Sequence, residues 1–165
     1  MPSAGKSVLV VTAHPGDFVW RAGGAIALHA AKGYRVKIAC LSYGERGESQ
    51  FAWKKAGVSL AEVKAQRRDE AERAAAILGA GIEFFDAGDY PLRGTEAIID
   101  RLVDINHELK PSMILTHSLE DPYNIDHPEA TRLAQEARII AQAAAEVSLV
   151  ATLPPECFWP RPDVT

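Results

Sequence analysis

The sequence predicts an α/β fold: a Rossmann-like, mostly parallel sheet flanked by helices on both faces. Short apolar runs alternate along the chain with longer segments of helical periodicity, and the first run, SVLVVTA, is rich in β-branched residues without polar alternation. Strands that alternate with helices are joined by right-handed crossovers, which make the sheet parallel. The 165 residues are expected to form one domain over 1–165.

Five apolar runs are the predicted strands. The run 7–13 is apolar throughout, as expected for a strand that is buried on both faces of its sheet. The other predicted strands are 35–41, 82–86, 112–117 and a less regular fifth at 148–152.

Four segments between these runs have helical periodicity. Gly33 and Gly79 follow the first two segments, and glycine commonly ends helices. Pro111 follows the third, where a helix cannot continue. The predicted helices are 19–32, 60–78, 95–109 and 127–146.

The loops after the first four strands contain most of the chemically useful side chains. These loops read AHPGDF, SYGERGES, DAGDYPLR and HSLEDPYNIDH. In open parallel sheets, ligands bind beyond the carboxyl ends of the strands, where such loops meet. The sequence therefore predicts a site at that edge of the sheet.

Composition excludes several classes of function. The 18 Lys and Arg residues against 22 Asp and Glu residues give a net charge of −4, so neither a nucleic acid nor a membrane is an expected partner. No apolar run approaches the about 18 residues of a membrane span, and residues 1–6 lack the apolar core of a signal peptide. Two cysteines are too few for a disulfide scaffold. We expect a cytoplasmic protein.

A divalent metal site is predicted from three residues. His14 and Asp17 share the first loop, and His127 ends the fourth loop at the same sheet edge. Two histidines and one carboxylate with an open position are typical of catalytic Zn²⁺ or Fe²⁺ centres, and Mn²⁺ also fits. A second interpretation is that Asp17 and Asp126 are only helix caps, since both stand at the start of predicted helices.

Three motifs resemble the PIG-L/LmbE-like zinc deacetylase superfamily across nearly the whole chain. They are AHPxD after the first strand, RxxEAxxAxxxLG from Arg67 to Gly79, and D-x5-H-P after the fourth strand. The resemblance implies a zinc cofactor with His14, Asp17 and His127 as ligands. Because the family domain extends further, the chain is expected to lack the C-terminal part or to receive an edge strand from another subunit. A homo-oligomer is therefore expected.

Gly16, Phe18 and Asn124 depart from the deacetylase pattern. The resemblance places the general base at position 16, and glycine cannot take a proton. The runs DFVWRAGGAIAL, CLSYGERGES and LEDPYNIDHPEAT instead resemble a hydratase branch of the superfamily, which acts on 4-oxalomesaconate in bacterial gallate degradation. This implies addition of water to the C=C bond of a small, anionic polycarboxylic keto acid, giving 4-carboxy-4-hydroxy-2-oxoadipate. The alternatives are a zinc-dependent N-deacetylase of an amino sugar or small amide, and a non-catalytic metal-binding module.

Three acidic residues are candidates for the missing base or its support. Glu48 and Glu45 lie in the second loop, and Glu48 is preferred; the competing interpretation is that both are solvated loop acids. Asp126 is a further candidate for the base of a deacetylase. Because it adjoins His127, it is alternatively expected to orient an imidazole ring, as carboxylates commonly do beside metal ligands.

An anionic substrate calls for arginine, whose planar guanidinium matches a carboxylate at two points. Arg21, Arg46 and Arg67 are the candidates, although Arg67 is equally suited to a salt bridge with Glu70 or Glu62. Candidates for hydrogen bonds to the substrate are Asn124 and Tyr123, and turn formation explains Asn124 equally well. His117, at the end of the fourth strand, is either a supporting group of the site or a core histidine.

Overall fold

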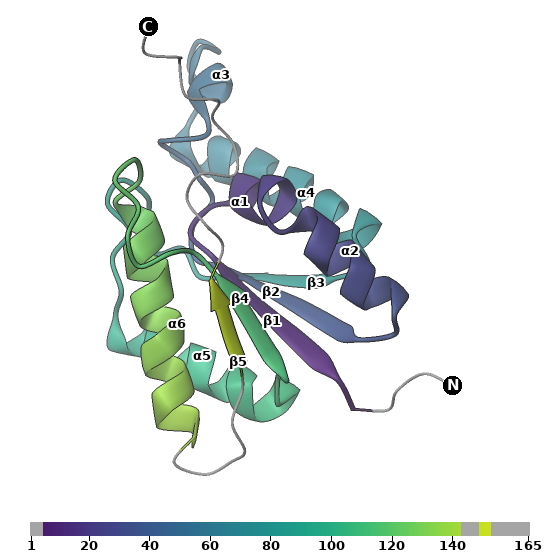
Figure 1. Cartoon of the computed structure of the whole chain (residues 1–165). Coiled ribbons are helices and arrows are strands. Elements are labelled where there is room, and N and C mark those ends of the chain that lie inside the picture. The colour runs from purple at the N-terminus through teal and green to yellow at the C-terminus, as the bar shows by residue number, and fades with distance from the viewer. Residues whose placement is uncertain (1–4, 143–148, 153–165) are drawn as a thin grey trace, which may run out of the picture.

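The structure is a computed structural model that describes residues 5–142 and the backbone of 149–152. Five parallel strands form one sheet in the order β3-β2-β1-β4-β5 (Figure 1). This confirms the predicted α/β fold. The strands are β1 (Ser7–Thr12), β2 (Arg35–Cys40), β3 (Gly81–Phe84), β4 (Met113–Thr116) and β5 (Leu149–Thr152).

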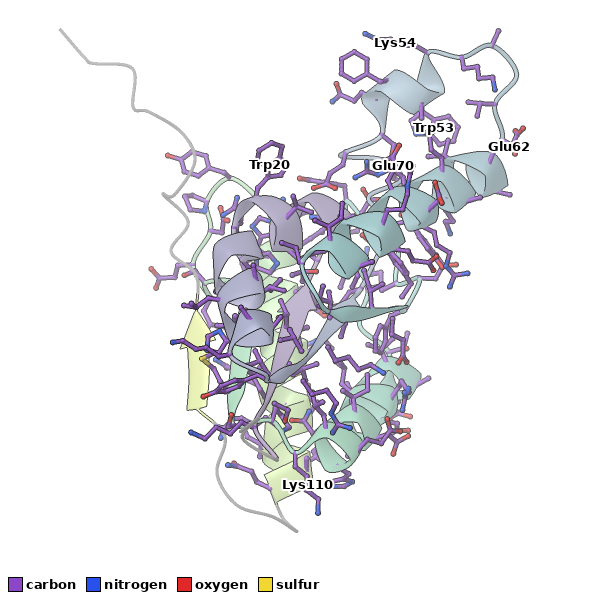
Figure 2. The ribbon with its side chains drawn as sticks, turned by 90° about the vertical axis from the view of Figure 1, so that its right-hand side faces the viewer. Trp20, Trp53, Lys54, Glu62, Glu70 and Lys110 are labelled. Carbon is purple, nitrogen blue, oxygen red and sulfur yellow. The ribbon has the colours of Figure 1, made fainter. Side chains whose placement is uncertain are left out.

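Helices cover both faces of the sheet. On one face lie α1 (Pro15–Trp20), α2 (Gly23–Ala31) and α4 (Leu60–Ile77), and on the other lie α5 (Glu96–Leu109) and α6 (Asp126–Gln142) (Figure 1). The short helix α3 (Gln50–Trp53) projects beyond the start of α4, as the view in Figure 2 shows. Within the described ranges, every helix is too short or too polar to cross a lipid bilayer.

The central strand β1 is buried on both faces, as its uniform apolar pattern predicts. Alternate side chains of a strand point to opposite faces, so they join different hydrophobic clusters. One cluster contains Val8 and Val10 with Phe18 and Ile26, and the other contains Leu9 and Val11 with Leu102 and Leu133. The sheet therefore has two packed cores, and its carboxyl edge is left for polar side chains.

The prediction of one helix over 19–32 is wrong. The chain forms α1 from Pro15, four residues earlier, and a separate α2 from Gly23. Proline is well suited to the first turn of a helix, and the Asp17 carboxylate accepts the His14 N–H at 3.0 Å, which stabilises that early start. Helix α1 ends at Trp20 with Arg21 as its C-cap, just before the Gly23-Gly24 pair.

The other predicted elements are present with small shifts in their bounds. Strand β3 begins one residue earlier and ends two residues earlier than predicted, and α6 begins at Asp126. Helix α5 begins after Thr95, whose hydroxyl accepts the Ile98 N–H as an N-cap. The predicted helical residues 143–146 lie outside the described residues. Helix α3 has only four residues and was not predicted.

Candidate metal centre

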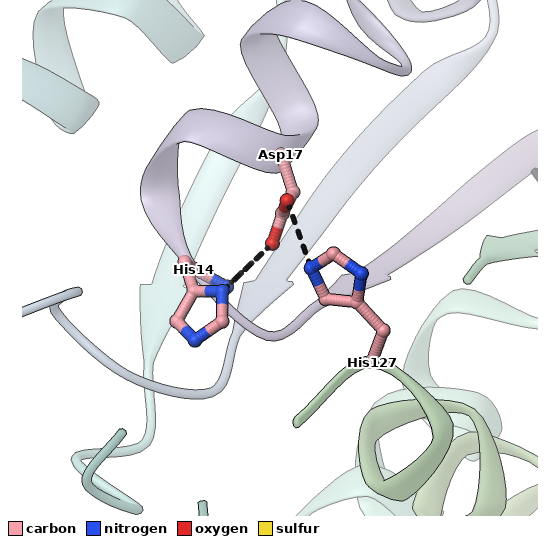
Figure 3. Close-up of side chains that lie close together, drawn as sticks. All are labelled: His14, Asp17 and His127. Atoms are coloured by element: carbon pink, nitrogen blue, oxygen red, sulfur yellow. Dashed lines mark hydrogen bonds and ion pairs between the residues drawn. The ribbon is translucent and has the colours of Figure 1, made fainter. Parts of the chain in front are cut away.

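His14, Asp17 and His127 meet at the carboxyl edge of the sheet (Figure 3). Each side chain offers one ligand atom, and these atoms all lie within 4.8 Å of one another. Asp17 contacts both rings, with Oδ2 at 3.2 Å from His14 Nδ1 and Oδ1 at 3.2 Å from His127 Nε2. All three residues are buried. The structure thus brings together the three metal ligands that the sequence predicts.

Local structure places the first two of these side chains. His14 is the N-cap residue of α1, directly after β1, and Asp17 is the third residue of the helix. The Asp17 carboxylate accepts the His14 backbone N–H, so it both stabilises the start of α1 and faces the two imidazole rings. The capping interpretation and the metal-ligand interpretation of Asp17 are therefore compatible.

Two further carboxylates contact the imidazole nitrogens that face away from Asp17. His14 Nε2 lies 2.9 Å from Asp126 Oδ2, and His127 Nδ1 lies 2.7 Å from Asp121 Oδ2. Both carboxylate side chains are almost fully buried. These contacts direct His14 Nδ1 and His127 Nε2 toward Asp17, which is the usual arrangement of carboxylate, histidine and metal.

Asp121 had no predicted role, and the imidazole partner of Asp126 was not identified from the sequence. The signal for Asp121 was present, because the D-x5-H spacing joins it to His127. Asp126 orients His14 rather than the adjacent His127. The interpretation of Asp126 as a helix cap is wrong: it is the first residue of α6, and its carboxylate instead accepts the backbone N–H groups of Tyr90 and Leu92, both at 2.8 Å.

The electrostatics of this cluster suit a cation. Burial alone raises the pKa of Asp17, but the neighbouring His127 and His14 imidazoles hold it well below its usual range. Burial lowers the pKa of His14, yet hydrogen bonds with Asp126 and Asp17 raise it to about 10. The same negative field that keeps a proton on His14 favours a divalent ion that displaces this proton.

Among the described residues, two buried imidazole nitrogens at this centre lack a hydrogen-bond partner: His127 Nε2 and His117 Nδ1. His127 Nε2 accepts and donates no hydrogen bond within the described part of the chain, and it faces Asp17 Oδ1. Buried polar atoms are nearly always paired, so an unpaired imidazole nitrogen beside a carboxylate fits a metal ligand. Two imidazole nitrogens and one carboxylate suit Zn²⁺, Fe²⁺ or Mn²⁺.

His117 supports the centre as a buried, neutral ring. It stacks on His127 with 4.0 Å between the ring centroids and 5° between the planes. Its Nε2 accepts the Ala13 N–H at 3.0 Å. Burial lowers the pKa of His117 to about 3, so this ring stays uncharged next to the cluster.

Glu48 lies beside the centre, in the place where a side chain of residue 16 would begin. Its Oε2 accepts the Gly16 N–H at 2.9 Å. A Cβ atom on Gly16 would lie 2.5 Å from Glu48 Oε1, so the glycine leaves room for this carboxylate. Burial and the charge of Asp17 raise the pKa of Glu48. A carboxylate from the second loop therefore occupies the position that the first loop leaves empty.

Glu45 has different surroundings, although it lies in the same loop. Its carboxylate accepts the Tyr43 N–H at 3.2 Å and lies 3.8 Å from Lys64 Nζ. Burial raises the pKa of Glu45. Of the two loop acids, Glu48 is the one that contacts the metal loop.

The three predicted arginines have different partners. Arg21 lies beside the centre, with Nε at 3.5 Å from Asp17 Oδ1. Arg67 forms ion pairs with Glu48 at 2.9 Å and with Glu70 at 2.7 Å, so the predicted salt bridge with Glu70 is observed. Arg46 is exposed and donates to the Tyr90 carbonyl oxygen at 3.4 Å.

The two remaining candidates, Asn124 and Tyr123, precede α6. Asn124 donates from Nδ2 to the Tyr90 hydroxyl at 2.7 Å and accepts the Asp126 N–H at 3.0 Å, so it also forms the predicted turn. Tyr123 is 84% exposed. Asn124 thus belongs to the network around the centre, and Tyr123 lies at the surface.

Comparison with known proteins shows the family. Residues 9–138 match the PIG-L family, described as GlcNAc-PI de-N-acetylase. This chain belongs to the PIG-L family. The PIG-L chain is 60% identical over 138 residues to the 4-oxalmesaconate hydratase of Pseudomonas putida KT2440, with 84% of this chain and 54% of that protein covered. It is 27% identical over 190 residues to a 1D-myo-inositol 2-acetamido-2-deoxy-alpha-D-glucopyranoside deacetylase of Rhodococcus erythropolis, with 96% and 62% covered.

Solved structures show the same fold. The crystal structure of GalB, the 4-carboxy-2-hydroxymuconate hydratase of Pseudomonas putida KT2440, superposes with a TM-score of 0.82 at 55% identity, with 90% of this chain and 64% of that chain covered. N,N'-diacetylchitobiose deacetylase from Pyrococcus horikoshii superposes with a TM-score of 0.78 at 24% identity, with 91% and 61% covered. This PIG-L chain therefore spans between half and two thirds of the length of these relatives.

Proposed function

We propose that this PIG-L chain carries the active site of a metal-dependent hydratase. Its substrate would be a small polycarboxylic keto acid, 4-oxalomesaconate, and its product 4-carboxy-4-hydroxy-2-oxoadipate. The observation that carries this proposal is the Glu48 carboxylate in the space beside Gly16, next to the three ligand side chains. The 60% identity to a protein named as a 4-oxalmesaconate hydratase supports the choice of substrate.

Glu48 is the proposed general base. Its carboxylate takes a proton from a water molecule whose oxygen bonds to one alkene carbon, while the π electrons of the C=C bond move toward the conjugated carbonyl oxygen. A proton returned to the other alkene carbon completes the addition of H and OH. The raised pKa of Glu48 suits this role, because a base is most effective when its pKa lies closer to the working pH.

We propose that one of the three arginines holds the base and that the other two bind the substrate. Arg67 is engaged by two carboxylates, so we assign it to holding Glu48 in place. Arg21 and Arg46 are left to bind substrate carboxylates, and Asn124 and Tyr123 are proposed for the same surface. Asp126 and Asp121 keep the His14 and His127 rings oriented.

Zinc is the metal that we propose, held by His14, Asp17 and His127. When bound there, such an ion supplies Lewis acidity toward an anionic oxygen. The two nitrogen ligands and one oxygen ligand support this assignment. Fe²⁺ and Mn²⁺ can bind the same set of ligands. Elemental analysis of the purified protein distinguishes the three metals.

We further propose a homo-oligomer located in the cytoplasm. Neighbouring apolar side chains on the projecting helix α3 support an interface between copies, since Phe51 is 85% and Trp53 is 41% exposed. Light scattering of the purified protein measures the number of subunits.

The test of the proposed function is loss of alkene absorbance in the presence of 4-oxalomesaconate. We expect Glu48→Gln to lower kcat by roughly 100- to 10,000-fold while the zinc content is unchanged, because only the base is lost. Glu72→Gln, on the exposed side of α4, is the matched control and is expected to keep full activity. Release of acetate from an N-acetylated amino sugar, without hydration, would show the deacetylase alternative instead.

Gly16→Ala tests the geometry of the same site. The added Cβ would displace the Glu48 carboxylate, so kcat should fall although no catalytic group is removed. Gly24→Ala is the matched control, because a Cβ on this helical glycine meets no atom within 4 Å. Equal activities of the two variants would show that the position of Glu48 does not matter.

The pH profile gives an independent check on Glu48. Only the ionised carboxylate accepts a proton. We therefore expect kcat/KM to increase as the pH rises through the pKa of Glu48, and to be low at pH values below that pKa, where the carboxylate is protonated. Burial and Asp17 raise this pKa, so the acid limb should lie above the range of an ordinary glutamate. The limb should be absent from the residual activity of Glu48→Gln.

A further inference from the structure

Tyr90 lies against the metal centre, in the loop between β3 and α5. Its ring stacks on the His14 imidazole, with 5.4 Å between the centroids and 8° between the planes. Its backbone N–H donates to Asp126 Oδ2 at 2.8 Å, the same oxygen that lies 2.9 Å from His14 Nε2. The ring and the backbone of Tyr90 are thus both held against one predicted ligand.

The second loop leaves a space for the Tyr90 ring. A Cβ on Gly47 would fall well inside the contact distance of the ring carbon Cε2, so only glycine allows this approach. Asp89 holds Gly47 there by accepting its N–H at 2.7 Å. The backbone of Tyr90 has a φ of 44°, which is rare for an aromatic residue and needs such support from its surroundings.

The hydroxyl group of Tyr90 is positioned by Asn124. The Asn124 amide donates to this oxygen at 2.7 Å. A phenol has one proton to donate in addition to its acceptor positions, so the contact with Asn124 leaves that proton available. Among the described residues the hydroxyl donates to no acceptor, and Tyr90 is 40% exposed. Burial and the charge of Asp126 raise the pKa of Tyr90, which keeps the phenol neutral.

We propose that Tyr90 is a substrate-binding residue whose hydroxyl donates a hydrogen bond to an anionic oxygen of the acid bound at this centre. Asn124, proposed above for the substrate surface, then acts there as a positioning residue, through its hydrogen bond to the Tyr90 hydroxyl. This inference rests on the proposed hydratase function. A neutral donor held in place is well suited to an oxygen that gains negative charge during hydration, because no reorganisation is needed as the charge develops.

The decisive variant is Tyr90→Phe, which keeps the ring on His14 and removes only the hydroxyl. We expect kcat/KM for hydration to fall by about 10- to 100-fold, as for the loss of a hydrogen bond to a charged group. We also expect weaker binding of 2-oxoglutarate, a dicarboxylic keto acid without a C=C bond, to the zinc-loaded protein, with Kd raised about 10-fold. Zinc content and melting temperature should not change.

Tyr34→Phe is the matched control, because Tyr34 contacts His29 edge-to-face at the other end of the sheet. It should leave kcat/KM and the 2-oxoglutarate Kd unchanged. Asn124→Ala should lower kcat/KM by less than Tyr90→Phe, and the two losses should not add in the double variant, because Asn124 acts through the Tyr90 hydroxyl.

Each result decides the inference. Wild-type kcat/KM and Kd in Tyr90→Phe would overturn it, and so would a loss of zinc or of melting temperature in this variant, since either would give the hydroxyl a structural role. If the wild-type protein binds 2-oxoglutarate through Tyr90 but hydrates no alkene, the inference holds and the proposed function fails. If the protein hydrates 4-oxalomesaconate and Tyr90→Phe has no effect, only the inference fails.

Discussion

Among the described residues, two networks of charged side chains that each connect several elements have opposite surroundings. The buried network lies at the carboxyl edge of the sheet, and the exposed network lies across β2, β3 and α5. Side chains of the buried network are 1–7% exposed, against 27–59% in the exposed network. The buried network consists of His14, Asp17, Asp121, Asp126 and His127, and the exposed network of Lys37, Glu83, Arg101 and Glu108.

Contact distances alone do not distinguish the two networks. Lys37 and Glu83 approach to 2.6 Å, and His127 and Asp121 to 2.7 Å. Removing charges from water is costly, so a buried network of charges is weak evidence for stability. Exposed ion pairs are screened by water and contribute little in either direction. This difference fits the cation that we propose for the buried network, whereas the exposed network makes only small contributions to the fold.

The largest expected effect is the loss of zinc affinity in Asp17→Ala, a variant of the buried network. This substitution removes a predicted ligand, so zinc affinity should fall by more than the about 10- to 100-fold that is typical when only a supporting residue is lost. Competition with a chromophoric chelator measures the affinity. Asp69→Ala is the control, since Asp69 is exposed and pairs with Arg73 in α4. Zinc affinity equal to that of the wild type in Asp17→Ala would mean that the metal binds elsewhere.

Asp121→Asn should have an intermediate effect. The amide keeps the shape of the side chain but loses the charge that orients the His127 ring, so zinc affinity should fall about 10- to 100-fold. Glu120→Gln is the matched control, as a change of the same kind at the adjacent exposed residue. If both variants bind zinc equally, the contact of Asp121 with His127 does not support the metal site.

The smallest effect is expected for Arg101→Ala in the exposed network. Loss of the ion pairs with Glu83 and Glu108 should lower the free energy of unfolding by less than about 1 kcal/mol, because water screens these charges. Arg101 and Lys37 lower the pKa of Glu83, so this contribution is present at neutral pH and is lost as the pH falls through the acidic range. Urea denaturation at several pH values measures it.

Zinc affinity measured in Arg101→Ala tests whether the exposed network is independent of the buried one. Arg101→Ala should leave zinc binding unchanged, and Arg73→Ala, which removes a single exposed pair within α4, should have an even smaller effect on unfolding. A loss of several kcal/mol in Arg101→Ala would show that the exposed network is a major source of stability, against the comparison above.

Much of the site could be predicted because its ligands follow strand and helix boundaries. His14 comes directly after β1, and His127 lies in the first turn of α6, so the parallel topology alone brings both to one edge. The break between α1 and α2 was missed. Apolar residues continue through the break at helical spacing, so periodicity does not reveal it, and the Gly23-Gly24 pair that stands there was not interpreted as a stop signal.

The partners of the supporting carboxylates could not be predicted from neighbours in the sequence. Adjacent residues of a helix point in different directions, so Asp126 does not reach His127 but contacts His14 from another loop. Likewise, nothing local distinguishes Glu45 from Glu48, since both stand in the same glycine-containing loop. Their different roles depend on Lys64 and Gly16, which come from other parts of the chain.

The alternation of strands and helices, the helices on both faces of the sheet and the grouping of three predicted ligands at one edge were already contained in the pattern of apolar runs, loops and motifs. Such features depend on local periodicity and on the general behaviour of parallel sheets. The orientation of each imidazole, the approach of Glu48 to Gly16 and the stacking of Tyr90 on His14 were not contained there. These contacts join loops far apart in the chain, and their geometry follows from packing, which sets distances of a few ångströms that sequence spacing does not encode.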